Sequence, residues 1–210
     1  CQNNNIECYR GDERDLLNRY YFLTKLIGAK NIIRLTCDCP FIDVKELDNM
    51  IKLFNFISID PNKKTTRATY IYNTNEVDFQ SIYPEGSDIE ICNMEALSFI
   101  WEKEKEMREH ATGCLRLKKD KYQDDVHIQF YDFLLNDETW KHDFTNLRLS
   151  IDDLNDYNLA KFIFEHFKEN ENFSFKDILS FLDLDIHYKE FERLTSDNKK
   201  LQTGQKLYKK

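Results

Sequence analysis

The chain has 210 residues, a formal net charge of −8, 41% hydrophobic residues and 32% charged residues. An acidic balance argues against a protein whose main task is to neutralise nucleic-acid phosphates or anionic lipids. No run of about 18 apolar residues is present to cross a membrane. With 5 Gly and 3 Pro, fibrous and low-complexity classes are excluded as well, which leaves a globular protein with a hydrophobic core.

Apolar spacing predicts helices and strands that alternate along the chain. In chain order we expect a helix over 16–27 closed by Gly28, a strand over 31–36, a helix over 45–57, strands over 68–73 and 88–93, a helix over 94–108, strands over 126–135 and 146–151, and helices over 159–167 and 178–182. Ser174 and Asp177 resemble a capping box ahead of the last helix.

This alternation predicts an α/β layered fold with a largely parallel sheet, in which ligands bind at the carboxyl ends of the strands. The β-rich stretch over 125–151 indicates some antiparallel pairing at one side. Residues 1–195 are expected to form one domain, followed by a basic tail over 196–210 that holds five Lys.

The cysteine pattern favours free thiols. Six cysteines occur, at positions 1, 8, 37, 39, 92 and 114, and none has the spacing of a zinc or redox motif. A domain of this size builds a core without disulfides. Because no basic-then-apolar leader is present either, we expect a cytoplasmic protein.

Two carboxylates follow strand ends. Asp38 comes directly after the 31–36 strand, before Pro40, and Asp152 comes directly after the 146–151 strand. Carboxylates at the mouth of an α/β sheet commonly hold Mg²⁺, which in turn binds phosphate oxygens. If the two strands are neighbours, Asp38 and Asp152 share one ion. The alternative is that Asp38 caps a turn and that the acids after Asp152 cap a helix.

Two further segments carry polar groups, Tyr83-Pro-Glu-Gly86-Ser-Asp88-Ile-Glu90 and Arg108-Glu109-His110. Taken alone, each segment has a purely structural explanation. The first can be a turn at Gly86, and in the second His110 can be a surface cation near a helix end. The sequence has no phosphate-binding glycine loop, dinucleotide fingerprint, zincin motif or hydrolase elbow. Asp183-Leu-Asp185 matches the metal motif of glycosyltransferases, but it lies away from the predicted strand ends.

Taken in order, five segments resemble the SpsF-like spore-coat polysaccharide cytidylyltransferases, relatives of the CMP-KDO and CMP-sialic acid synthetases. They are Arg10-Gly-Asp-Glu-Arg-Asp15-Leu-Leu-Asn-Arg19-Tyr20, Arg34-Leu-Thr-Cys-Asp38-Cys-Pro40-Phe-Ile-Asp43, the segment from Tyr83 to Glu90, Arg108-Glu-His110-Ala-Thr112 and Leu147-Arg-Leu-Ser-Ile-Asp152. The resemblance covers about residues 8–182. It implies a Rossmann-like nucleotide-diphospho-sugar transferase fold of the GT-A type.

The resemblance also implies a reaction, the transfer of CMP from CTP to a sugar or sugar acid with release of pyrophosphate, in glycan biosynthesis. Asp38 and Asp152 match the family's Mg²⁺ ligands, and such an ion would stabilise the charge that develops on the phosphates. The partners implied are CTP and the sugar, with no nucleic acid and no membrane, and relatives often form homodimers.

Carried over residue by residue, the remaining matches fall into two groups. Asp15, Arg19 and Arg34 match segments that line the nucleotide pocket. The residues that match segments facing the acceptor sugar are Tyr83, Gly86, Asp88, Glu90, Arg108, Glu109 and His110.

The sequence also departs from the family pattern. Cys37 replaces the usual Gly before the metal-binding Asp, and Asp153-Leu-Asn-Asp156 replaces Thr-Pro-Glu-Asp. Nothing matches the Gly-Ser-Arg-Leu-Pro-Gly-Lys loop with which the family opens, so Cys1 aligns inside the family and the domain is expected to be N-terminally truncated. The alternative to an enzyme is a degenerate relative that binds a sugar or a partner protein without catalysis.

Overall fold

The computed structural model describes residues 2–63, 65–73, 86–131, 141–142, 147–170 and 172–195. The chain divides into two compact units. Unit 1 comprises Cys1–Arg34, Asn49–Tyr72 and Glu90–Tyr131, and unit 2 comprises Leu35–Asp48, Asn73–Ile89 and Asp132–Lys210. The expected basic tail, 196–210, lies outside the described residues.

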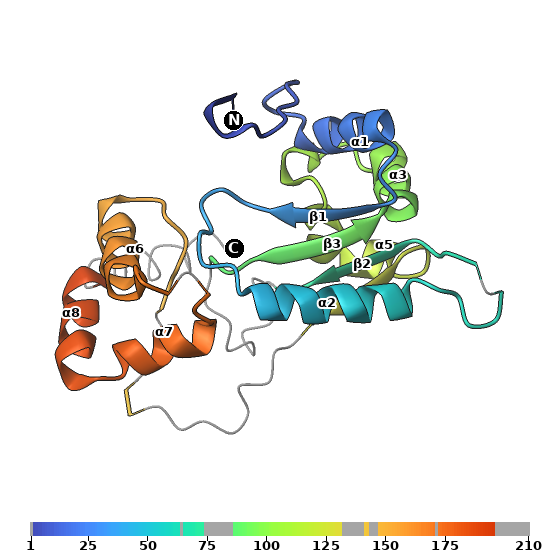
Figure 1. Cartoon of the computed structure of the whole chain (residues 1–210). Coiled ribbons are helices and arrows are strands. Elements are labelled where there is room, and N and C mark those ends of the chain that lie inside the picture. Colours follow the sequence, from blue (N-terminus) through green and yellow to red (C-terminus); the bar gives the residue numbers. More distant parts are fainter. Residues whose placement is uncertain are drawn as a thin grey trace, which may run out of the picture. The chain divides into compact units, whose positions relative to one another are not determined.

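The described elements are a mixture of helices and strands, as expected for an α/β protein (Figure 1). The strands are β1 (Asn31–Leu35), β2 (Thr69–Tyr72), β3 (Ile89–Asn93) and β4 (His127–Phe130). The helices are η1 (Gln2–Asn4), α1 (Leu16–Ile27), α2 (Val44–Ile57), α3 (Met94–Lys103), η2 (Arg108–His110), α4 (Gly113–Leu117), α5 (Lys119–Tyr122), α6 (Leu154–Phe167), α7 (Phe175–Leu182) and α8 (Asp185–Thr195). None of the described helices is both long and apolar enough to cross a membrane.

The four described strands form one sheet in the order β1-β3-β2-β4. β2 pairs in parallel with β4 but antiparallel with β3, with Ile71 opposite Ile91. Next to β1, Met94 N donates to Lys30 O at 2.8 Å and Arg34 pairs with Glu90, the register of an antiparallel pair. The prediction of a largely parallel sheet is therefore wrong, because the central strand β3 runs against its neighbours.

Unit 1 buries its core between this sheet and helices α1 and α3. All four residues of β2 are buried, and Leu17 of α1 and Leu97 of α3 are fully buried. Burying one such leucine side chain stabilises the fold by about 2 kcal/mol. The Tyr21 and Trp101 rings stack at 4.1 Å, which fixes α1 against α3. Gly28 ends α1 with a φ of +67°, as the sequence predicts.

Unit 2 has an aromatic core around α6, α7 and α8. Phe41 stacks on Phe164 at 4.7 Å, and Phe167 stacks on Phe173 at 4.4 Å. The predicted capping box at Ser174 and Asp177 is present at the start of α7. α6 begins at Leu154, earlier than the expected residue 159, because Asp153 caps it with a second capping box.

Three predicted strand or helix extents differ from the structure. α3 ends at Lys103 because Glu104 leaves the helix with extended backbone angles. β4 ends at Phe130, and residues 132–135 of the expected strand lie outside the described residues. Over 147–151 the backbone forms a single bridge at Arg148 in place of a regular strand.

Candidate functional site

The Asp38 segment leaves β1 in a tight turn that unit 2 holds in place. Cys39 N donates to Thr36 O at 3.2 Å, and Phe41 is buried in the unit 2 core. Asp43 then caps α2 by accepting bonds from the amides of Lys45 and Glu46, and its second oxygen accepts from Phe175 N. The turn is thus anchored on its C-terminal side, while Asp38 itself is exposed.

Gly86 brings a second segment against residues 149–150. Its φ of +100° lies in the region that favours glycine, and a Cβ added there would lie 1.9 Å from Ser150 N. The carbonyl carbon of Leu149 would lie 2.2 Å away. Only glycine permits this backbone approach, which places the chain leading to Asp88 beside the chain leading to Asp152.

A backbone hydrogen bond brings the third segment to the first. Ile151 N donates to Asp38 O at 2.8 Å, so Asp152 follows directly on a residue that is bonded to Asp38. The segments of Asp38 and Asp152, whose adjacency the sequence alone does not establish, are therefore neighbours in unit 2. We call the region formed by Asp38, Cys39, Asp88 and Asp152 the acidic site.

Arg148 fixes the carboxylate of Asp152. Its Nη1 lies 3.0 Å from Asp152 Oδ2, and its Nη2 binds Asp156 Oδ2. The Asp156 side chain is fully buried and also accepts bonds from the amides of Asp152 and Asp153. Asp152 is 53% exposed, so this bridge orients a carboxylate that a ligand can still reach.

Cys39 contacts Asp38 and lies near Asp88, two of the three acids of the acidic site. Its thiol lies 3.7 Å from Asp38 Oδ1 and accepts a bond from the Thr36 hydroxyl at 2.9 Å. Burial raises the pKa of this thiol to about 11, and the charges of Asp88 and Asp38 act in the same direction. Cys39 is therefore a protonated thiol at neutral pH.

The carboxylates of the acidic site fit a Mg²⁺ ion whose coordination shell is completed by water and phosphate. No group of three or more His, Cys, Asp or Glu side chains within the described ranges is arranged to hold a metal ion. Mg²⁺ usually binds one or two carboxylates and completes its shell with water and substrate phosphates. The exposed carboxylates of Asp38 and Asp152 suit that arrangement.

In unit 1, Asp15 and Arg108 form an ion pair at 2.9 Å. Asp15 also caps α1 through Asn18 N, and Arg108 donates to the carbonyl of Trp101 in α3 and to that of Glu104 just after it. The pair therefore joins the start of α1 to the end of α3. Arg19, in the first turns of α1, has a buried Nε atom that finds no hydrogen-bond partner among the described residues.

Glu90 is buried with a side-chain exposure of 2%. Its Oε1 accepts from Arg34 Nη1 at 2.8 Å, and its Oε2 accepts from the Thr112 hydroxyl. Both oxygens are therefore bonded within unit 1. Arg34 and Glu90 hold β1, β3 and the segment after His110 together.

The Arg108-Glu109-His110 segment forms η2 and ends in a constrained residue. The side chains of Glu109 and His110 are 68% and 50% exposed, and they lie 3.7 Å apart. Ala111, which follows, is fully buried with a φ of +48°. Such a conformation persists only where its surroundings hold it, here next to the Thr112–Glu90 bond.

Glu104 anchors the loop that leads to η2. It is 1% exposed, and it accepts bonds from the amides of Glu106 and Met107, from Tyr122 and from Lys118. Burial by itself would raise the pKa of Glu104, but the bonds from Tyr122, the two amides and Lys118 outweigh it and hold the pKa far below the ordinary 4.5.

We expect Glu104→Gln to destabilise the protein by about 2 kcal/mol at pH 7, because it removes charge-assisted bonds in a buried position. Because the folded-state pKa is depressed, this stabilisation exists above the unfolded-state value of 4.5 and is lost as the pH falls below it. Urea unfolding from pH 7 to pH 3 should show the difference between wild type and variant shrinking. Glu106→Gln is the matched control, because Glu106 binds the same Lys118 but is 83% exposed. If the difference in unfolding free energy between wild type and Glu104→Gln did not change with pH, that would contradict the depressed pKa of Glu104.

The Asp183-Leu-Asp185 motif has other bonding partners. Asp183 accepts from the amides of Lys141 and His142, and Asp185 pairs with Lys141 Nζ at 2.5 Å. The His142 ring lies 3.1 Å from an oxygen of each carboxylate. These bonds attach residues 141–142 to the start of α8, so the motif has a structural role.

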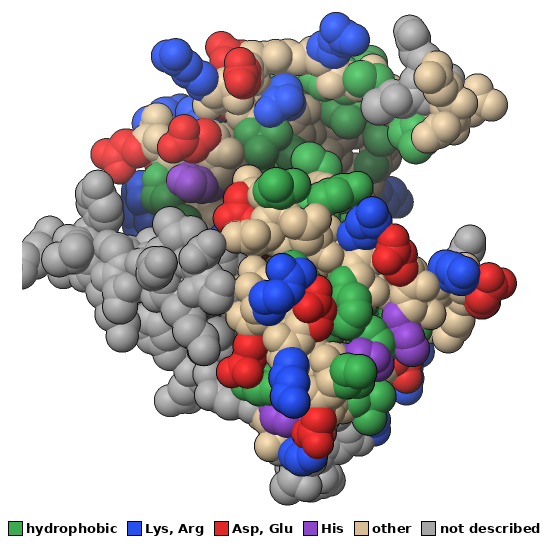
Figure 2. Space-filling view, turned by 90° about the vertical axis from the view of Figure 1, so that its left-hand side faces the viewer, with side chains coloured by type: hydrophobic (Ala, Val, Ile, Leu, Met, Phe, Trp, Pro, Cys, Tyr) green, Lys and Arg blue, Asp and Glu red, His purple; other side chains and the backbone are tan. Residues whose placement is uncertain are grey.

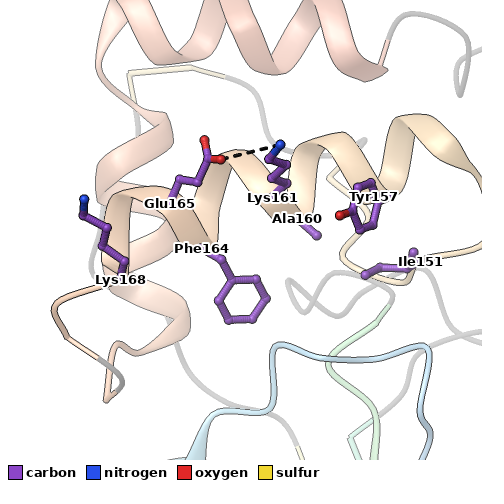
Figure 3. Close-up of a pocket in the computed structure, with 7 residues that line it drawn as sticks. All are labelled: Ile151, Tyr157, Ala160, Lys161, Phe164, Glu165 and Lys168. Atoms are coloured by element: carbon purple, nitrogen blue, oxygen red, sulfur yellow. Dashed lines mark ion pairs between the residues drawn. The ribbon is translucent and has the colours of Figure 1, made fainter.

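A groove of about 430 Å³ lies on α6, close to the acidic site along the chain. Its lining residues are Ile151, Tyr157, Ala160, Lys161, Phe164, Glu165 and Lys168 (Figure 3).

The described part of the face in Figure 2 carries acidic, basic and hydrophobic side chains intermixed. Tyr83 lies outside the described residues.

Sequence reasoning missed three residues that hold the candidate segments in place. Arg148 and Cys39 in unit 2 and Glu104 in unit 1 were not singled out, although Arg148 and Asp152 stand four positions apart. The spacing from Arg148 to Asp152 was one available signal. For Cys39 and Glu104 the bonding partners are set by tertiary structure, and the sequence carries no local signal for them.

No family model matches this sequence. Over 185 residues the chain is 25% identical to an uncharacterized protein of Methanocaldococcus jannaschii, a match that covers 87% of this chain and 65% of that protein. The structure is similar to that of a cytidylyltransferase from Leptospira borgpetersenii, with a TM-score of 0.68 and 27% identity over 92% of this chain and 70% of that one. The chain thus has a mixed α/β fold of the nucleotidyltransferase type, as the sequence predicts.

Proposed function

We propose that this chain is a Mg²⁺-dependent nucleotidyltransferase that transfers CMP from CTP to a sugar or sugar acid and releases pyrophosphate. The similarity to a cytidylyltransferase over 92% of the chain supports a nucleotidyl transfer. The acceptor and the glycan pathway rest on the sequence resemblance. The chain spans 65% of the length of the curated relative, and the proposal concerns the activity to which these residues contribute.

The observation that carries the proposal is the Ile151–Asp38 backbone bond, because it places two exposed carboxylates on adjoining segments. Asp38 and Asp152 would hold the ion from one side, and the phosphates of the nucleotide would complete its shell. Bound there, Mg²⁺ supplies charge neutralisation at the α-phosphate and at the leaving pyrophosphate. Arg148 keeps Asp152 in the orientation that this requires.

The other residues assigned by resemblance divide by exposure. In unit 1 the side chains of Glu109 and His110 are exposed to solvent, and in unit 2 the partly exposed Asp88 can accept bonds from sugar hydroxyls. Asp15, Arg34, Glu90 and Arg108 are bonded to one another in pairs. We propose that these four act indirectly, by holding the backbone of the segments that contact the ligands.

The compartment and the assembly remain proposals of the same kind. The described cysteines, at positions 8, 37, 39, 92 and 114, are free thiols, which supports a reducing compartment such as the cytoplasm. A homodimer follows from the resemblance, and sedimentation analysis of the purified chain would measure it.

We expect the wild-type chain to bind CTP in the presence of Mg²⁺ and to bind it at least about tenfold more weakly without the ion. Asp38→Ala should abolish this difference, because it removes one of the two carboxylates. Titration calorimetry with CTP, with and without Mg²⁺, measures both effects.

Asp124→Ala is the matched control, since Asp124 is an exposed carboxylate of unit 1 outside the acidic site. It should bind CTP as the wild type does. A folded wild-type chain that binds a sugar but shows no Mg²⁺-dependent CTP binding would contradict the enzyme and favour the non-catalytic relative.

A further inference from the structure

Cys39 lies where the segments of the acidic site meet, and the proposed function gives it no role. Its side chain is 5% exposed. The Thr36 hydroxyl donates to its sulfur at 2.9 Å, and the thiol donates to Asp38 Oδ1 at 3.7 Å. Asp88 lies close enough for its charge to raise the pKa of this thiol. One side chain therefore contacts Thr36, just after β1, and the Asp38 carboxylate, and it lies near the residue before β3.

The directions of these bonds give the Cys39 thiol proton one acceptor among these partners. A thiol has one weak donor and acceptor lone pairs. The Thr36 hydroxyl donates to the sulfur, and the Asp38 carboxylate accepts from it. An ionised carboxylate only accepts, so the S–H proton of Cys39 lies on the side of Asp38.

We propose that Cys39 is a positioning residue that orients the Asp38 carboxylate through a thiol–carboxylate hydrogen bond. Asp38 is exposed, so few neighbouring atoms restrict the rotation of its side chain. Carboxylates that bind metals are commonly held by hydrogen bonds from neighbouring groups, and the loss of such a partner weakens metal binding. The role in cation binding rests on the proposed function, whereas the hydrogen bond does not.

Two substitutions separate this role from packing. Cys39→Ser keeps a donor at the same position, and Cys39→Val keeps an apolar side chain that fills the site but cannot donate. We expect Cys39→Val to weaken the binding of Mn²⁺, used as a paramagnetic probe in place of Mg²⁺, by about tenfold, while Cys39→Ser stays within about threefold of the wild type. Electron paramagnetic resonance of free Mn²⁺ measures the affinity. Cys37→Val, an exposed cysteine two positions away, is the control and should not change it.

The S–H stretching band in the infrared gives a readout that needs no metal. Subtracting the Cys39→Ser spectrum from that of the wild type isolates the Cys39 band. We expect this band at lower frequency than that of a thiol without an acceptor, and we expect it to rise in Asp38→Ala.

These outcomes distinguish the two claims. If the band does not move in Asp38→Ala, or if Cys39→Val binds Mn²⁺ as the wild type does, the positioning role is overturned and the proposed metal site stands. If the band moves but the wild type binds no Mn²⁺ at millimolar concentration, the hydrogen bond stands and the metal site of the proposed function fails. Thermal unfolding of each variant shows whether a loss of binding reflects a loss of fold.

Discussion

Gly86→Ala is expected to destabilise the protein by about 3 kcal/mol or more, because the new Cβ would collide with backbone atoms. The nearest atoms are Ser150 N at 1.9 Å and Leu149 C at 2.2 Å, and neither belongs to a side chain that can turn away. The φ of +100° adds the cost of a conformation that L residues rarely adopt. For a chain of this size the loss corresponds to a melting temperature lower by about 6–12 °C.

Gly28→Ala separates strain from collision. Gly28 also has a positive φ, +67°, but a Cβ added there would meet nothing within 4 Å. We expect it to lose only about 1 kcal/mol. Urea unfolding of the three proteins measures the difference, and equal losses in the two variants would contradict the close approach of Gly86 to residues 149–150.

Arg148→Met is expected to cost about 3 kcal/mol, because it removes the Arg148 guanidinium from the buried Asp156 carboxylate. The Asp156 side chain has no exposed surface and the Arg148 side chain is 18% exposed, so water cannot replace the guanidinium. Methionine keeps much of the apolar stem, so the loss reports mainly on the charge. Denaturant unfolding at pH 7 measures it.

Lys161→Met is the matched control for this loss. Lys161 Nζ lies 3.7 Å from Glu165 Oε1, and the two side chains are 56% and 67% exposed. An exposed pair of this kind contributes at most about 0.5 kcal/mol. If Arg148→Met were no more destabilising than Lys161→Met, the bridge from Asp152 to Asp156 would not be the support of the acidic site that the structure indicates.

Local rules in the sequence predicted local structure well. Gly28 ends α1 and the Ser174–Asp177 box starts α7, because both features act within one turn of the chain. Strand direction is different, since it depends on which strands meet. Nothing within residues 88–93 indicates that β3 runs antiparallel to β2, and the alternation of helices and strands favoured the wrong direction.

The charged residues show the same difference between what a local pattern predicts and what the tertiary structure decides. Asp38 and Asp152 were identified because a carboxylate directly after a strand is a local pattern. Glu90, inside the predicted 88–93 strand, was assigned to the acceptor side by the resemblance, yet the structure buries it against Arg34, which is 56 positions away. A sequence shows that a residue is charged, but its burial depends on a partner brought up by the fold. Glu104 ends α3 early for that reason, because Tyr122 and Lys118 hold it.

The central claim is that Asp38 and Asp152 hold one divalent cation together with CTP. Calorimetry of CTP binding in the presence of Mg²⁺, on Asp38→Ala, Asp152→Ala and the double variant, tests it most directly. If one ion is shared, each single variant loses the Mg²⁺-dependent part of the affinity and the double variant loses no more. Single losses that add up in the double variant, or single variants that bind as the wild type does, would contradict the claim.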